Sequence, residues 1–187
     1  MESLSLLLDP VVARAVGAAL SVVLLTAGWQ KLRDPALFRA TLANYRLLPE
    51  NWLWEIALLL PLWEISAGAL LLFPSTRVAA ALLTTGLLFV VTAAVIINLG
   101  RGRTGIDCGC GGFGGHVGEQ TLNWTLVVRN AVLVAAALFV PGEEEIRVLV
   151  WIDYLSVAGG TLGLLGLYAS ANQLMANEPR LQALRNY

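Results

Sequence analysis

Five apolar stretches, each long enough to cross a lipid bilayer, dominate this sequence and leave few alternatives for its fold. A helix needs about 20 apolar residues to span the hydrocarbon core of a membrane. The stretches are residues 10–30, 52–73, 78–100, 121–140 and 148–171. They predict an all-α integral membrane protein, with residues 1–187 forming a single transmembrane domain. Its core is a helical bundle of about five transmembrane helices in the lipid bilayer.

Composition excludes the other broad classes of protein. Charged residues make up 13% of the chain and hydrophobic residues 57%, with a mean hydropathy of +0.71. A soluble domain carries about 25% charged residues, so this chain cannot cover a water-exposed surface. A net charge of −1 provides no basic field, so we expect no nucleic-acid partner. Two cysteines are too few for a disulfide framework.

The first stretch differs from a cleaved signal peptide. Glu2 and Asp9 precede it where a leader would be basic, and no small-residue cleavage site follows it. We therefore expect a retained helix. After it, Asp34-Pro35 is typical of a helix start, and Pro49 ends the segment. The apolar residues between them recur at helical spacing, which predicts a short amphipathic helix at the membrane interface.

The second long connection, residues 101–120, holds both cysteines in a glycine-rich run. Gly109 separates Cys108 from Cys110 and provides the backbone freedom that a tight ring demands. A disulfide across one residue is strained, and strained disulfides are the labile or catalytic ones. Asp107 would oppose thiolate formation, whereas the dipole of the following helix would favour it only if the loop folds back. The motif predicts redox chemistry at Cys108 and Cys110.

Two other interpretations of the loop stay open. A metal site would use Cys108, Cys110, His116 and Asp107, but closed zinc sites prefer two to four residues between cysteines. No metal site is therefore predicted, although soft-metal transport is an alternative because thiolates select soft ions. In the third interpretation the two cysteines have no chemical role.

Charged residues also occur inside the predicted spans. Glu64 lies within the second span, Arg129 within the fourth and Asp153 within the fifth. Such residues face the bundle interior and pair, so Glu64 with Arg129 and Asp153 with Arg129 are the two candidate pairs. Either pair could lock the packing of the helices, or it could transfer protons or contact a cofactor.

The positive charges predict an orientation in the membrane. Five spans place the first long connection, the cysteine loop and the C-terminal tail on one face. That face carries Lys31, Arg33, Arg39, Arg46, Arg101, Arg103, Arg180 and Arg185. The other face carries Arg77, Arg147 and, at its margin, Arg14. The positive-inside rule therefore places the cysteine loop in the cytoplasm.

Several segments together resemble one family. They are residues 27–35 (AGWQKLRDP), 45–49 (YRLLP), 60–68 (LPLWEISAG), 107–110 (DCGC) and Arg129-Asn130. The chain resembles the methylamine-utilisation protein MauE family, within the wider MauE/DoxX-like group of redox-associated membrane proteins. It departs from that pattern after Cys110, where Gly111-Gly112 precede Phe113 and the family has an aromatic residue directly.

The resemblance implies a multi-pass protein of the bacterial cytoplasmic (inner) membrane that assists maturation of an exported enzyme. That enzyme would be a disulfide-containing subunit of the methylamine-dehydrogenase type, and a thioredoxin-like protein would be the partner. Thiol–disulfide exchange would occur at Cys108 and Cys110, supported by Asp107, Gly109, Glu64 and Arg129. Whether the protein is itself an enzyme, a thiol–disulfide oxidoreductase, is left open.

Two conflicts follow from these expectations. Exported substrates are oxidised outside the cytoplasm, whereas the positive charges place the loop inside. One cysteine pair also cannot carry electrons across about 30 Å of hydrocarbon. Either a quinone or another cofactor accepts the electrons, or the protein only presents its partner. A non-catalytic membrane anchor or accessory subunit of a larger complex is therefore the main alternative function, and a soft-metal carrier is the third.

Overall fold

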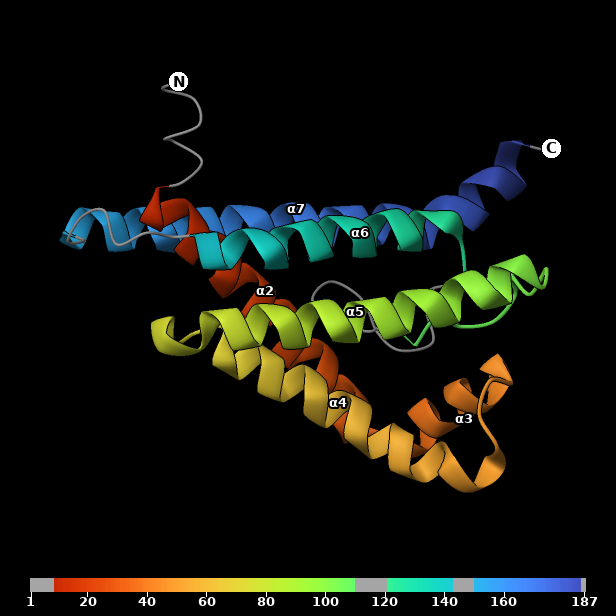
Figure 1. Ribbon diagram of the computed structural model, residues 1–187. Coiled ribbons are helices and arrows are strands. Elements are labelled where there is room, and N and C mark those ends of the chain that lie inside the picture. Colours follow the sequence, from red (N-terminus) through yellow and green to blue (C-terminus); the bar gives the residue numbers. More distant parts are fainter. Residues whose placement is uncertain (1–8, 110–120, 143–149, 186–187) are drawn as a thin grey trace.

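The structure, a computed structural model, describes residues 9–109, 121–142 and 150–185, and the side chains of that last segment as far as Asn177. The described chain is almost entirely helical, with one isolated β-bridge. Its α-helices are α2 (Pro10–Arg33), α3 (Pro35–Tyr45), α4 (Leu53–Leu70), α5 (Arg77–Gly100), α6 (Trp124–Phe139) and α7 (Trp151–Arg185) (Figure 1). Short 3₁₀ helices are η1 (Glu50–Trp52), η2 (Pro74–Thr76) and η3 (Val140–Gly142). The predicted all-α fold is confirmed.

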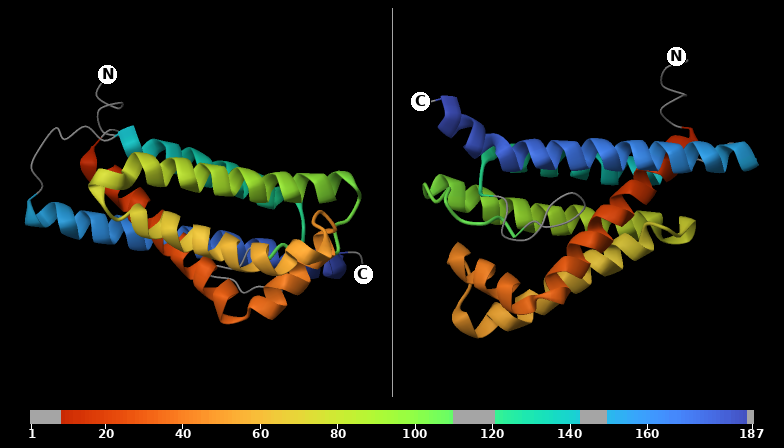
Figure 2. Two further views of the ribbon diagram at one scale, coloured as in Figure 1. Left: turned by 60° about the horizontal axis from the view of Figure 1, so that its bottom comes forward. Right: turned by 180° about the vertical axis from the view of Figure 1, so that it is seen from behind.

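The five long helices alternate in direction through the molecule. α3, the end of α5 with the start of the cysteine loop, and the end of α7 lie at one end, which we call the loop end (Figures 1 and 2). The start of α2, η2 and η3 lie at the opposite end (Figure 1). The first long connection, the start of the cysteine loop and the end of α7 thus share one end, as five passes require.

Four of the helices are long and apolar enough to cross a membrane, namely α2, α4 with η1, α5 with η2, and the first part of α7. The fifth, α6, is apolar but has only 16 residues, fewer than residues 121–140 predicted. Asn123 explains the difference, because its side chain accepts the backbone N–H of Leu126 at 3.0 Å and so starts the helix later. Large apolar side chains cover much of the outer surface, such as Phe89 (72% exposed) and Leu167 (70%). Such a surface suits a lipid environment.

The last helix is longer than the sequence predicted. The expected span ended at residue 171, whereas α7 continues to Arg185. The polar residues after residue 171 continue the helix because no glycine stop follows the apolar run. One of them, Asn172, is buried.

Local signals place the ends of α2 and α3. The side chain of Asp9 accepts the backbone N–H of Val11 at 2.8 Å, and Pro10 occupies the first turn of α2. Asp34 caps α3 in the same way, accepting from Leu37 at 2.9 Å. The short helix predicted from Asp34-Pro35 is therefore confirmed, and it ends where Arg46 adopts a left-handed conformation (φ 50°).

Small residues bring α2 and α4 into close contact. A Cβ on Gly28 would lie 2.7 Å from Cγ1 of Ile65, and one on Gly68 would lie 3.1 Å from Cβ of Leu24. Ser21 Oγ also donates to the carbonyl of Gly68 at 2.7 Å. Such close approach is typical of helix pairs inside membranes. It fixes α2 against α4 and aligns the polar groups further along both helices.

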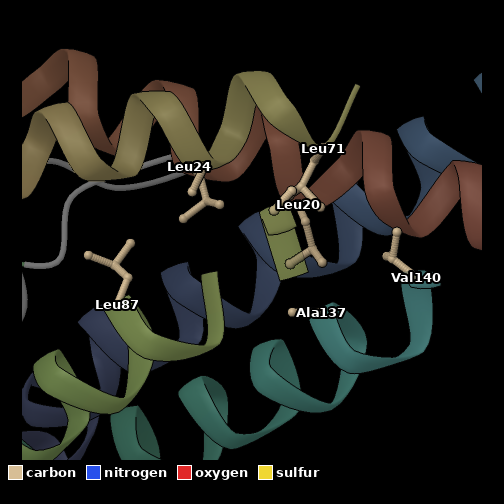
Figure 3. Close-up of a cluster of buried hydrophobic side chains, with 8 residues drawn as sticks. Leu20, Leu24, Leu71, Leu87, Ala137 and Val140 are labelled. Carbon is tan, nitrogen blue, oxygen red and sulfur yellow. The ribbon is translucent and has the colours of Figure 1, made fainter. Parts of the chain in front are cut away.

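A buried apolar cluster joins the bundle in its half away from the loop end. It brings together side chains from four helices and η3, drawn in Figure 3. Its labelled members are Leu20, Leu24, Leu71, Leu87, Ala137 and Val140. Lys31, Glu64 and Arg129 lie nearer the loop end than this cluster, whereas Asp153 lies at the opposite end, at the start of α7.

Candidate functional site

The cysteine loop is closed at its base by two backbone contacts. Asp107 and Thr121 form an antiparallel bridge, and the N–H of Leu122 donates to the carbonyl of Ile106 at 3.0 Å. Arg103 ties the loop to the helices, since its Nη1 donates to the carbonyl of Tyr45 (3.2 Å) and to Oδ1 of Asn98 (3.3 Å). The start of the loop is therefore held by both α3 and α5.

Cys108 is anchored through its backbone and buried. Tyr45 Oη donates to the Cys108 carbonyl at 2.8 Å, and the residue is only 6% exposed. It packs in a cluster with apolar side chains from α3, α5, α6 and the segment before α6. We call this the Cys108 cluster; its other buried members are Tyr45, Val95, Leu99, Leu122 and Leu126. The position of Cys108 is thus fixed relative to three helices.

Gly109 has the backbone conformation and the packing that only glycine satisfies. Its φ is +65°, which L side chains rarely adopt. A Cβ there would lie 3.0 Å from Cγ2 of Thr41 and 3.3 Å from Cε2 of Phe38. Gly109 therefore lets the loop lie directly on α3.

Asp107 also contacts α3. Its Oδ2 accepts a hydrogen bond from Thr41 Oγ1 at 3.4 Å. The carboxylate thus helps to dock the loop on the helix. The other expected loop residues, Cys110, His116, Gly111-Gly112 and Phe113, lie outside the described residues, as does any bond between the two sulfur atoms. Where the chain is described, no three residues of the types His, Cys, Asp and Glu lie close enough together to hold a metal ion.

Glu64 is paired with Lys31, which the sequence indicated only as one of the positive charges on the loop face. Lys31 Nζ donates to both carboxylate oxygens of Glu64, at 2.6 and 2.7 Å, and the residues are 3% and 6% exposed. Lys31 lies three residues after Gly28, on the helix face that approaches Glu64 most closely.

The Lys31–Glu64 pair connects to the cysteine loop through one aromatic ring. Lys31 Nζ lies 5.5 Å from the centre of the Phe38 ring, within the range of a cation–π contact. The same ring lies against Gly109, and Phe38 is 3% exposed. Contacts therefore run without a break from α4 through α2 and α3 to the loop.

Arg129 lies elsewhere, between α6 and α7. Its Nη1 donates to Oδ1 of Asn172 at 3.2 Å and its Nη2 to Oδ1 of Asn130 at 3.2 Å, while Asn130 Nδ2 donates to Thr92 Oγ1 at 3.0 Å. Asp153 lies at the other end of α7, where its Oδ2 accepts the N–H of Val150 at 2.9 Å. Glu64 instead bonds to Lys31, and Arg129 and Asp153 lie against opposite ends of α7, so the described contacts differ from the two pairs expected for Arg129.

These features define a small all-helical membrane protein in which a cysteine-bearing loop is docked on a short helix at one end of the bundle. The family model described as "Methylamine utilisation protein MauE" matches residues 9–141, which run from the cap of α2 into η3. The chain belongs to this MauE family. The resemblance found in the sequence is therefore confirmed.

Curated relatives support the assignment over most of the chain. The methylamine utilization protein MauE of Methylorubrum extorquens is 37% identical over 172 residues, 92% of this chain and 86% of the relative. The protein of the same name from Paracoccus denitrificans is 39% identical over 132 residues, 71% of this chain and 69% of the relative. The protein of the same name from Methylophilus methylotrophus is 42% identical over 106 residues, which are 57% of this chain and 56% of the relative. No solved structure matches the chain.

Proposed function

We propose that this protein acts in methylamine utilisation as a membrane redox factor, exchanging disulfides with a thioredoxin-like partner through Cys108 and Cys110. The exchange would assist maturation of an exported, disulfide-containing enzyme of the methylamine-dehydrogenase type. The observation that carries the proposal is the docking of the loop. Cys108 is held by Tyr45, and Gly109 lies directly on Phe38 and Thr41. The fixed backbone at Cys108 and Gly109 supports presentation of the motif to a partner in one orientation.

The chemistry needs two cysteines and one partner disulfide. The thiolate of one cysteine attacks a sulfur of the partner's disulfide, forming a mixed disulfide and releasing a partner thiolate. The second cysteine then attacks the mixed disulfide, which leaves a disulfide in this protein and two thiols in the partner. The reverse sequence oxidises the partner. The burial of Cys108 supports a resolving role for it, with Cys110 making first contact with the partner.

Single cysteine variants test the proposal. We expect Cys108→Ser to accumulate a mixed disulfide with the partner through Cys110, because the resolving thiol is absent. Cys110→Ser should accumulate far less of this mixed disulfide, because the cysteine that first contacts the partner is absent. Both variants should abolish methylamine-dependent growth, and the products can be resolved on non-reducing gels. Ser75→Cys, in η2 at the opposite end, should leave growth unchanged.

The main alternative is a non-catalytic accessory subunit of a larger membrane complex. The same burial of Cys108, together with the Lys31–Glu64 pair, favours it, because both also serve to stabilise helix packing. Under this alternative the double variant Cys108→Ser/Cys110→Ser would still assemble and support growth. A soft-metal carrier would instead bind a thiophilic ion that this double variant loses.

A further inference from the structure

The ammonium group of Lys31 lies between a carboxylate and an aromatic ring. Its Nζ donates to both carboxylate oxygens of Glu64, at 2.6 and 2.7 Å, and lies 5.5 Å from the centre of the Phe38 ring. Lys31 and Phe38 are each 3% exposed, and Glu64 is 6% exposed. The three side chains therefore form one buried unit that joins α2, α3 and α4.

The packing of α2 on α4 does not by itself require two buried charges. Glu64 lies well inside the apolar span of α4, where an ionised side chain is costly. The attraction within a buried ion pair only partly offsets the cost of removing both charges from water, and apolar residues of similar volume pack as well or better. The two helices are already held by their close approach at Gly28 and Gly68 and by the hydrogen bond from Ser21. The charges therefore serve a purpose besides joining the two helices.

The ring of Phe38 is the group that a fixed cation at this position would hold. A cation over the face of an aromatic ring attracts the ring, and the attraction is strongest where both are removed from water. The carboxylate of Glu64 fixes the ammonium of Lys31, so the ammonium restricts the movement of the ring. The same ring lies against the loop, because a Cβ on Gly109 would lie 3.3 Å from its Cε2 atom. Gly109 directly follows Cys108, so the position of the ring limits where the backbone of Cys108 can lie.

We propose that the Lys31–Glu64 pair positions the cysteine loop by holding the ring of Phe38. The ring supports the backbone at Gly109, and this support keeps Cys108 buried. The use of this arrangement in disulfide exchange rests on the proposed function, whereas its effect on the exposure of Cys108 does not.

The alkylation rate of Cys108 tests the inference when it is compared with thermal stability. The full-length protein carries Cys110→Ser, so that Cys108 is the remaining thiol, and is placed in phosphatidylcholine nanodiscs. Lys31→Met/Glu64→Gln keeps side chains of similar volume and removes the cation over the ring. We expect its Cys108 to be alkylated about 3–10-fold faster, while its thermal unfolding stays close to that of the parent Cys110→Ser protein. Arg33→Met, an exposed change on the same helix, should alter neither quantity.

Fluorinated phenylalanines in place of Phe38 test the cation–π contact without removing the ring. Fluorine withdraws electron density from the ring face and so weakens its attraction for a cation. We expect the alkylation rate to rise stepwise with one, two and three fluorine atoms in the parent protein. In Lys31→Met/Glu64→Gln the rate should not depend on fluorination. A role of Phe38 in packing alone would give the same response in both proteins.

The outcomes separate the positioning from the proposed function. Alkylation of the double variant at the parent rate, or the same response to fluorine in both proteins, would overturn the positioning. A double variant that reacts faster only because it has lost thermal stability would also overturn it. If the double variant does not fold, the fluorine series in the parent decides, since a flat series rejects the positioning and a stepwise rise supports it. Faster alkylation in a protein whose Cys108→Ser/Cys110→Ser variant still supports growth would support the positioning and reject the thiol exchange.

Discussion

At the scale of single residues, position 109 restricts both the backbone conformation and the size of the side chain, and glycine satisfies both restrictions. Alanine in the left-handed region costs about 1–2 kcal/mol, and its Cβ would also lie 3.0 Å from Thr41 Cγ2. We expect Gly109→Ala to undock the loop and raise the rate of Cys108 alkylation by about 5–30-fold. The measurement uses the Cys110→Ser background, in which Cys108 is the remaining thiol.

Gly105 provides the matched control for that prediction. It lies in the same loop, and a Cβ there meets nothing within 4 Å. Gly105→Ala should therefore leave the alkylation rate of Cys108 unchanged. Equal rates in the two alanine variants would mean that Gly109 does not hold the loop on α3.

A substitution of Tyr45 tests whether the hydrogen bond to the Cys108 carbonyl holds Cys108 in place. Tyr45→Phe removes the hydroxyl that donates to this carbonyl, which contributes about 1 kcal/mol. We expect alkylation of Cys108 to become about fivefold faster in the same background, with the ring still packed in the cluster. Tyr154→Phe, on the exposed surface of α7, is the control. A Tyr45→Phe protein that reacts at the original rate would contradict the anchoring.

At the scale of helices, the Lys31–Glu64 pair joins α2 to α4. Removing one partner of a buried ion pair leaves an uncompensated charge and costs about 3–5 kcal/mol. We expect Lys31→Met to lower the free energy of unfolding by this amount, and Lys31→Met/Glu64→Gln to recover most of the loss. Thermal unfolding in detergent measures both variants. Arg33→Met, at an exposed position two residues further along α2, should have little effect on the free energy of unfolding. A double variant no more stable than Lys31→Met would contradict the pairing.

The sequence predicts the helices better than it predicts which side chains meet between them. Runs of apolar residues predicted the long helices, and Asp34-Pro35 predicted α3, because span length and capping are local properties. Asn123, a local cap that was not recognised, made α6 shorter than expected. Which side chains meet between helices depends on their rotation. Glu64 was therefore recognised as buried and charged, while its partner Lys31 was missed.

The candidate site shows the same division between local and long-range information. Cys108, Gly109 and Asp107 stand out because they form one short motif. Phe38, Thr41 and Tyr45, which hold that motif, are about 65 residues earlier in the chain and look like ordinary residues of an amphipathic helix. Only the fold shows that α3 lies beneath the loop.

At the scale of the whole molecule, the orientation in the membrane decides whether an exported substrate can reach the loop. Positive charges gather at the loop end, which favours the cytoplasm. The proposed maturation role requires that end to face outward from the bacterial inner membrane, and we propose this orientation. Arg39 lies on α3, where its guanidinium is 5.4 Å from the centre of the Trp54 ring. Basic residues on such an interfacial helix can bind headgroups on either leaflet.

A membrane-impermeant maleimide, applied to intact cells, tests this orientation. We expect the native cysteines to label after prior reduction. Ser75→Cys in the Cys108→Ser/Cys110→Ser background should label only once the membrane is breached, because η2 lies at the opposite end. The reverse pattern would place the loop in the cytoplasm, in agreement with the charges, and direct exchange with an exported enzyme would then be untenable. Labelling of both positions in intact cells would contradict the alternation of the helices, since it would put both ends of the bundle on the same side.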